Sequence, residues 1–233
     1  MKSQTCNVLA ASRIWTPGIE ERLSQRTGTP FVLISEKERL NVAELTKLGP
    51  QRVFLPHWSF KIPEELHTAF ECVIFHMTDV PFGRGGSPLQ NLIARGIYDT
   101  KITALRCAVE MDAGPVYLKR PFSLANGTAQ QLLTAATHLI EDMIVEIVKT
   151  NSVPQPQRGT PVVFKRRGPA DSDLTAASSI QQAYDFIRML EADGYSPAFL
   201  EVGELRYEFS AAVLDGTEVR AQVTITRRRE SRE

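Results

Sequence analysis

The sequence lacks the features that mark membrane, metal-binding and disulfide-stabilised proteins. Its three cysteines, Cys6, Cys72 and Cys107, stand alone in apolar stretches and form no CxxC pair. We therefore expect reduced, buried thiols, no metal site and no disulfide framework. No apolar run approaches the roughly 18 residues that span a bilayer, and the N-terminus carries no signal-peptide pattern. These absences predict a cytoplasmic protein with no membrane partner.

An excess of charge is also lacking. Lysine plus arginine number 27 and aspartate plus glutamate number 27, which gives a formal net charge of zero. Proteins that bind nucleic acid through its phosphates usually carry a clear basic excess, so we expect no bulk nucleic-acid binding. What remains is an ordinary globular composition, 42% hydrophobic and 23% charged over 233 residues. This is enough for one medium domain, or for a main domain with a small appendage.

Short apolar runs alternate with helix-like stretches along the first two-thirds of the chain, which is typical of βαβ units. The pattern predicts a doubly wound, Rossmann-like α/β domain over residues 1–150. Strands are expected at 7–11, 31–34, 52–55, 72–75, 103–109 and 114–118. Helices are expected at 17–26, 42–48 and 128–149, the last with apolar residues at the spacing of one buried stripe.

The composition changes after the long helix. Residues 151–168 begin with proline-containing, polar sequence and are predicted to be a linker. Residues 169–233 then read as a small α+β appendage, with a helix over 179–192 and a hairpin that turns at Asp215-Gly216. Pairing of this hairpin across a homodimer stays open.

One segment, residues 75–88, concentrates groups that can do chemistry. A buried strand delivers His76 at its C-terminal end, where parallel sheets place ligands. The following turn carries Arg84 among glycines that allow close approach of a ligand, although their spacing fits no phosphate-binding loop. A second turn, Glu110–Pro115, holds Asp112 at another strand end. His76 and Asp112 can form an oriented acid/base pair, and a purely structural histidine is the alternative.

These two segments resemble the hallmark region of the folate-dependent formyltransferases. In that family a strand ends in Asn-x-His, and a loop follows with Pro, two variable residues, Arg-Gly and a further Pro. An Asp-x-Gly turn comes later in the chain. The matching residues here are His76, Pro81, Arg84-Gly85, Pro88 and Asp112-Ala113-Gly114. The similarity covers roughly residues 5–150.

The resemblance implies transfer of a formyl group from 10-formyltetrahydrofolate to an amine without a metal. His76 is expected to stabilise the oxyanion and to assist proton transfer, and Asp112 to orient His76. The folate is expected between the loops 56–62, 80–86 and 110–114. Its binding residues would be Pro56, Trp58, Ile62, Val80, Arg84, Gly85, Met111 and Gly114. A buried core position is the alternative for Trp58.

The sequence departs from the family at one catalytic position. The family asparagine two residues before the histidine is Ile74, which cannot donate a hydrogen bond to the formyl oxygen. Three interpretations stay open at this point. His76 acts alone; another donor (Asn91, Thr78 or a backbone N–H) replaces the asparagine; or the site is impaired. Asn91 is the side chain we predict as the third catalytic residue.

Within the family, the segment 76–93 is more similar to small members associated with amino-sugar modification than to the tRNA enzyme. The balanced charge agrees with this, and the region after the linker is short for the OB-like domain of the tRNA enzyme. We therefore expect a nucleotide-linked amino sugar as acceptor, with Arg166 and Arg167 on its diphosphate unless they form a solvated basic turn. The alternatives are a formyl-folate hydrolase, a non-catalytic folate or nucleotide-sugar binding protein, and formylation of an aminoacyl group held by RNA or a carrier protein.

Overall fold

The structure is a computed structural model that describes residues 5–228, so residues 1–4 and 229–233 of the predicted terminal segments lie outside it. The chain divides into two compact units, each assembled from separate stretches. The first unit comprises residues 1–85, 100–122 and 133–163, and the second comprises 86–99, 123–132 and 164–233. Each unit is described by itself.

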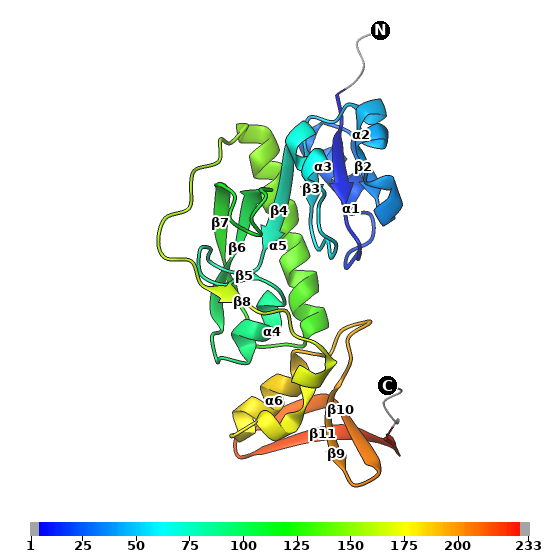
Figure 1. The fold of residues 1–233 in the computed structure, drawn as a ribbon, viewed down its shortest axis with the longest axis vertical. Coiled ribbons are helices and arrows are strands. Elements are labelled where there is room, and N and C mark those ends of the chain that lie inside the picture. Colours follow the sequence, from blue (N-terminus) through cyan, green and yellow to red (C-terminus); the bar gives the residue numbers. More distant parts are fainter. Residues whose placement is uncertain (1–4, 229–233) are drawn as a thin grey trace. The chain divides into compact units, whose positions relative to one another are not determined.

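A six-stranded sheet of order β2-β1-β3-β4-β6-β7 forms the centre of the first unit (Figure 1). The first four of these strands in space are parallel, and β6 runs antiparallel to β4. The predicted parallel-dominated α/β class is therefore confirmed. The strands are β1 (Asn7–Ala10), β2 (Phe31–Ile34), β3 (Val53–Leu55), β4 (Cys72–His76), β6 (Asp99–Arg106) and β7 (Val116–Ser123).

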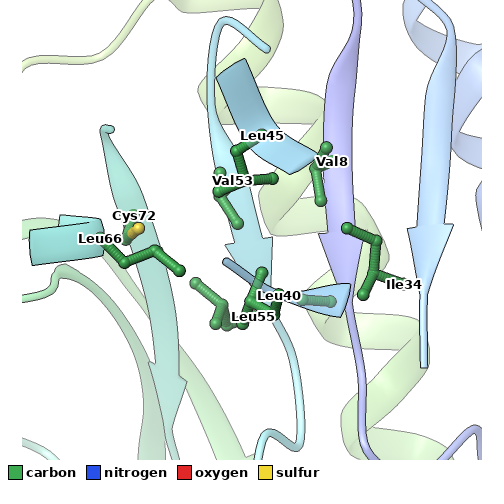
Figure 2. Packing of buried hydrophobic residues seen from close by; sticks show 9 residues of the cluster. Val8, Ile34, Leu40, Leu45, Val53, Leu55, Leu66 and Cys72 are labelled. Atoms are coloured by element: carbon green, nitrogen blue, oxygen red, sulfur yellow. The ribbon is translucent and has the colours of Figure 1, made fainter. Parts of the chain in front are cut away.

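Helices pack on this sheet because its inner strands are mostly apolar and buried, with every residue of β1 and β3 buried. Leu45 and Leu66 lie in one hydrophobic cluster with strand residues such as Val8, Val53 and Cys72 (Figure 2). The helices that follow the early strands are α1 (Ile19–Thr27), α2 (Val42–Leu48) and α3 (Glu64–Ala69), with a 3-10 turn at Lys37–Arg39. The long helix is α5 (Ala129–Thr150). None of the described helices is long and apolar enough to cross a membrane.

The second unit holds the predicted C-terminal helix and hairpin, together with a strand that the sequence pattern did not reveal. Its antiparallel sheet has the order β11-β10-β9, and Gly216 lies in the hairpin turn with φ of 56° (Figure 1). The elements are α4 (Pro88–Ile93), α6 (Ile180–Arg188), β9 (Ala198–Val202), β10 (Leu205–Asp215) and β11 (Glu218–Arg227), with 3-10 turns at Pro169–Ser172 and Leu174–Ala176. A separate two-stranded ribbon joins β5 (Arg84–Gly85) to β8 (Val163–Phe164).

The cysteines are free thiols in the described chain, with Cys6 and Cys72 buried and Cys107 half-buried. Burial raises the pKa of Cys72 to about 12 and that of Cys107 to about 11. Both thiols are therefore protonated near neutral pH and poorly reactive.

Candidate active site

The structure brings His76 and Asp112 together in the first unit. His76 is the last residue of β4 and is only 7% exposed. Its Nδ1 lies 3.5 Å from Oδ2 of Asp112, within ion-pair reach, and its Nε2 lies 2.7 Å from the carbonyl oxygen of Gly83. A neutral imidazole has one N–H, whereas an imidazolium can donate to both of these oxygens at once. The two predicted catalytic residues thus meet, although His76 ends β4 and Asp112 lies in the turn between β6 and β7.

The loop that follows His76 is fastened to the neighbouring strands by polar contacts. Thr103 of β6 donates to the carbonyl oxygen of Thr78 at 2.7 Å. Asp79 forms ion pairs with Lys101 of β6 at 2.9 Å and with Lys119 of β7 at 2.5 Å. Burial opposes the charge of Asp79, but the hydrogen bonds from the two lysines outweigh it and hold its pKa below the ordinary value. The loop is therefore held firmly where it contacts the His76 ring.

Asp112 lies in a turn that its neighbours make possible. Its φ of 53° is left-handed, which is unusual outside glycine, asparagine and aspartate. Its Oδ2 accepts a hydrogen bond from the backbone N–H of Gly85 at 2.9 Å. A Cβ atom on Gly114 would lie 1.8 Å from the carbonyl oxygen of Arg106, so only glycine fits there. This close approach is the physical reason for an Asp-x-Gly sequence at the turn.

Arg84 braces this turn. The residue is 8% exposed, and its guanidinium group donates to Oε1 of Gln157 at 2.9 and 3.2 Å and to Oε1 of Glu110 at 3.1 Å. Gln157 in turn donates to the carbonyl oxygens of Asp112 and Gly114. Gln157 has no signal in the sequence, because it lies in the linker and belongs to no motif there.

Asn91, the predicted third catalytic residue, makes its contacts within the second unit. It is 4% exposed, and its Nδ2 donates to the carbonyl oxygens of Gly86 at 2.9 Å and Lys165 at 2.8 Å. Its Oδ1 accepts a hydrogen bond from Arg95 at 2.8 Å. The carboxamide is thus occupied by structural partners in its own unit. Its catalytic role stays a prediction.

The predicted folate-binding residues fall into two groups. Trp58 and Ile62 are half-buried and pack against the hydrophobic cluster of the first unit, and Pro56 and Val80 are buried. Both interpretations of Trp58, a folate contact or a core position, stay predictions. Met111 is by contrast 63% exposed and lies in the Asp112 turn, with Val109 close by at 72% exposed. Apolar side chains open to solvent in the stretch that carries Asp112 are suited to contacting a ligand. In residues 5–228 no three His, Cys, Asp or Glu side chains are grouped as a metal site.

The two predicted phosphate-binding arginines belong to the second unit. Arg166 is exposed, and its backbone lies so close to Gly86 that a Cβ there would be 2.6 Å from the Cα of Arg166. Arg167 donates its backbone N–H to Ser87 and places its guanidinium group 5.8 Å from the ring centroid of Phe186. Burial lowers the pKa of Arg167 from its ordinary value. Their role in phosphate binding stays a prediction.

Comparisons with known proteins all find proteins described as formyltransferases. Residues 169–226 match the profile described as methionyl-tRNA formyltransferase, C-terminal domain. A structure described as methionyl-tRNA formyltransferase from Clostridium thermocellum has 38% identity and a TM-score of 0.91, over 96% of this chain and 99% of that chain. The methionyl-tRNA formyltransferase of Corynebacterium urealyticum is 30% identical over 126 residues, covering 51% of this chain but 38% of that protein. A sugar N-formyltransferase from a Shewanella species has 14% identity and a TM-score of 0.64 over 85% of this chain and 93% of that chain, a likeness of fold alone.

The ring of His57, within the predicted folate loop 56–62, makes the free energy of unfolding depend on pH. Its Nε2 lies 2.9 Å from Oγ1 of Thr137, whose hydroxyl donates to the carbonyl oxygen of Leu133, so the ring is the donor to Thr137. Burial lowers the pKa of His57 from 6.5 to about 4. A histidine whose pKa is lowered in the fold stabilises the folded state above pH 6.5. This contribution to the free energy of unfolding is lost as the pH falls toward 4.

We expect the free energy of unfolding to fall by up to about 3 kcal/mol more between pH 7 and pH 4 in the wild type than in His57→Gln. Urea unfolding of both proteins across this range would measure the difference, because the carboxylates they share titrate in both. An identical pH dependence in the two proteins would contradict a neutral, buried His57.

Proposed function

The chain belongs to the folate-dependent formyltransferase family, and on that premise we propose that it transfers a formyl group from 10-formyltetrahydrofolate to a primary amine. The observation that carries the proposal is the meeting of His76 and Asp112, 3.5 Å apart at the ends of two different segments. The chain spans 38% of the length of the Corynebacterium relative and 99% of the Clostridium structure.

Formyl transfer to an amine requires groups that stabilise an oxyanion and move a proton. The neutral amine attacks the formyl carbon, and negative charge develops on the formyl oxygen. The amine nitrogen then loses a proton, and the bond to the folate nitrogen breaks as that nitrogen gains one. A protonated His76 would stabilise the oxyanion, and the Asp112 carboxylate would stabilise the charged ring and fix its orientation. To reach the oxyanion, Nε2 must exchange its contact with the carbonyl oxygen of Gly83 for one with the substrate.

The residues present fit a folate. The exposed side chains of Val109 and Met111 supply apolar surface for a flat heteroaromatic ring within the stretch that carries Asp112. Gly83 and Gly85, with φ of 75° and 104°, leave the backbone of the His76 loop unobstructed by Cβ atoms. The loops 80–86 and 110–114 would therefore hold the donor.

For the acceptor, we propose the amine of a nucleotide-linked amino sugar in the cytoplasm. The zero net charge of the chain and the similarity of the segment 76–93 to sugar-modifying members support this choice. Arg166 and Arg167 would contact the diphosphate, as guanidinium groups do elsewhere.

A second acceptor is the aminoacyl group of a charged tRNA. Two observations favour it: the match of residues 169–226 to the C-terminal domain of methionyl-tRNA formyltransferase, and the 38% identity to the Clostridium protein. The match of residues 169–226 also counts against the expectation that the C-terminal region is too short to bind tRNA.

One experiment separates these functions. The protein would be incubated with 10-formyltetrahydrofolate and, in parallel, with no amine, a panel of nucleotide-linked amino sugars, or methionyl-tRNA, and the products identified by mass spectrometry. Formylated sugar or formylated aminoacyl-tRNA would identify the acceptor. Formate produced without any amine would show a hydrolase, and folate binding without any product would show a binding protein.

A further inference from the structure

The linker that leaves α5 is fixed at two points on the candidate site. Val116 and Gln155 exchange backbone hydrogen bonds of 2.7 and 2.8 Å. Further on, Val162 donates its N–H to the carbonyl oxygen of Pro81 and accepts the N–H of Arg84, both at 3.0 Å. The first point lies just after the Asp112 turn and the second on the loop that carries Arg84. The linker therefore spans the two segments that the site combines.

Between these points, the side chain of Gln157 joins the same two segments. Its Oε1 accepts hydrogen bonds from Nε and Nη2 of Arg84 at 3.2 and 2.9 Å. Its Nε2 donates to the carbonyl oxygens of Asp112 at 2.7 Å and Gly114 at 2.8 Å. An amide has two donor hydrogens and two acceptor lone pairs, so all of its capacity is used. The partners also fix the orientation of the amide, because a guanidinium can only donate and a carbonyl can only accept.

These contacts close a ring of interactions around Asp112. Gln157 holds Arg84, the next residue Gly85 donates its N–H to the Asp112 carboxylate at 2.9 Å, and Gln157 holds the Asp112 carbonyl oxygen. The carboxylate and the backbone of Asp112 are thus held from two sides. This matters because the left-handed backbone of Asp112 must be maintained for its carboxylate to face His76.

We propose that Gln157 is a positioning residue for formyl transfer: through Arg84 and the Asp112 turn, it keeps the Asp112 carboxylate against the His76 ring. The proposal rests on the proposed function for its kinetic consequence, and on the geometry alone for its effect on His76. Gln157 does not touch the reacting atoms, so its removal should lower kcat with little change in KM for the folate.

Two substitutions at this position separate the two halves of the contact. Gln157→Glu keeps an acceptor for Arg84 but turns a carboxylate oxygen toward the carbonyl oxygens of Asp112 and Gly114, which it cannot satisfy. Gln157→Ala removes both halves. Gln155→Ala is the matched control, because Gln155 lies two residues away, is exposed and pairs with Val116 through its backbone.

The test combines steady-state kinetics with NMR of the histidine rings, of which the chain has four. We expect kcat to fall about 10- to 100-fold in both Gln157 variants and less than about twofold in Gln155→Ala. The ring resonances of His76 should move in the Gln157 variants, whereas those of His57 should not. The NMR result requires no turnover, so it tests the positioning role even if the proposed acceptors all fail.

Two results would overturn the proposal. One is an unchanged His76 resonance in both Gln157 variants. The other is a loss of kcat that Gln155→Ala shares, or that follows a common fall in melting temperature, since either would assign the linker a general structural role.

Discussion

Replacing His76 by asparagine is expected to lower kcat at least about 1,000-fold, because the variant loses the imidazole that would stabilise the oxyanion and move the proton. Asparagine occupies less volume than histidine and is polar, so the buried site at the end of β4 should accept it and the variant should remain folded. Asp112→Asn keeps an oxygen for the N–H of Gly85 but removes the charge beside the ring. We expect it to lower kcat about 100- to 1,000-fold.

The measurement is single-turnover formyl transfer with saturating folate donor, together with calorimetric folate binding. A matched control is His138→Gln, since the His138 side chain is 63% exposed on α5. Folate affinity should change little in the His76 variant, because the expected loss lies in the transition state. Full activity in both the His76 and Asp112 variants would rule out this pair as the catalytic centre.

The replacement of the family asparagine by Ile74 limits which groups can assist His76. Ile74 lies in the middle of β4, between Leu55 and Leu105 on the neighbouring strands, and contributes only hydrocarbon. The Thr78 hydroxyl is fully buried and directed to the carbonyl oxygen of Gly83 at 3.4 Å. The Asn91 amide is bonded to Gly86 and Lys165. With both side chains engaged, His76 alone or a backbone N–H is the simpler source of oxyanion stabilisation.

Sequence periodicity predicted the bounds of some strands and helices of the first unit correctly. The strand at 31–34 and the helix at 42–48 have the predicted bounds, because a short apolar run and a capped amphipathic run each identify one structure. The strand predicted at 103–109 instead covers residues 99–106. Its first residues are polar, and its last four, residues 103–106, pair with β4. The strand ends where this pairing ends, which the local sequence does not encode.

In the candidate site, too, some residues could be predicted from the local sequence and others could not. His76 and Asp112 were predicted from recognisable motifs. The fold places His76, at the end of β4, 3.5 Å from Asp112 in the turn between β6 and β7. Gln157 was not predicted, because a glutamine in a polar linker has no local signal and acquires its role only when the linker returns to Val116 and Pro81. Short paired segments such as β5 and β8 likewise exist only through tertiary contact.

Removing the Asp185 carboxylate is expected to destabilise the second unit by about 3–5 kcal/mol, because it would leave a buried charge without its partner. The Arg188 and Asp185 side chains are 1% and 2% exposed, and they form an ion pair of 2.6 Å. Arg188 also donates to the carbonyl oxygens of Leu124 and Gly127, both at 2.9 Å, and Tyr98 donates its hydroxyl to Asp185 at 2.6 Å. Asp185→Ala would remove the carboxylate partner of both the Arg188 guanidinium group and the Tyr98 hydroxyl.

Urea unfolding of Asp185→Ala, read with hydrogen exchange over α6, would measure this loss. Glu44→Ala is the control: Glu44 and Lys47 form an exposed pair at 2.9 Å, and such pairs contribute less than about 1 kcal/mol. The double variant Asp185→Leu/Arg188→Met should recover part of the stability, because it removes both charges. Recovery should be incomplete, since the carbonyl oxygens of Leu124 and Gly127 lose their donors. A loss in Asp185→Ala no larger than in Glu44→Ala would mean that water reaches Arg188 and that this ion pair does not stabilise the unit.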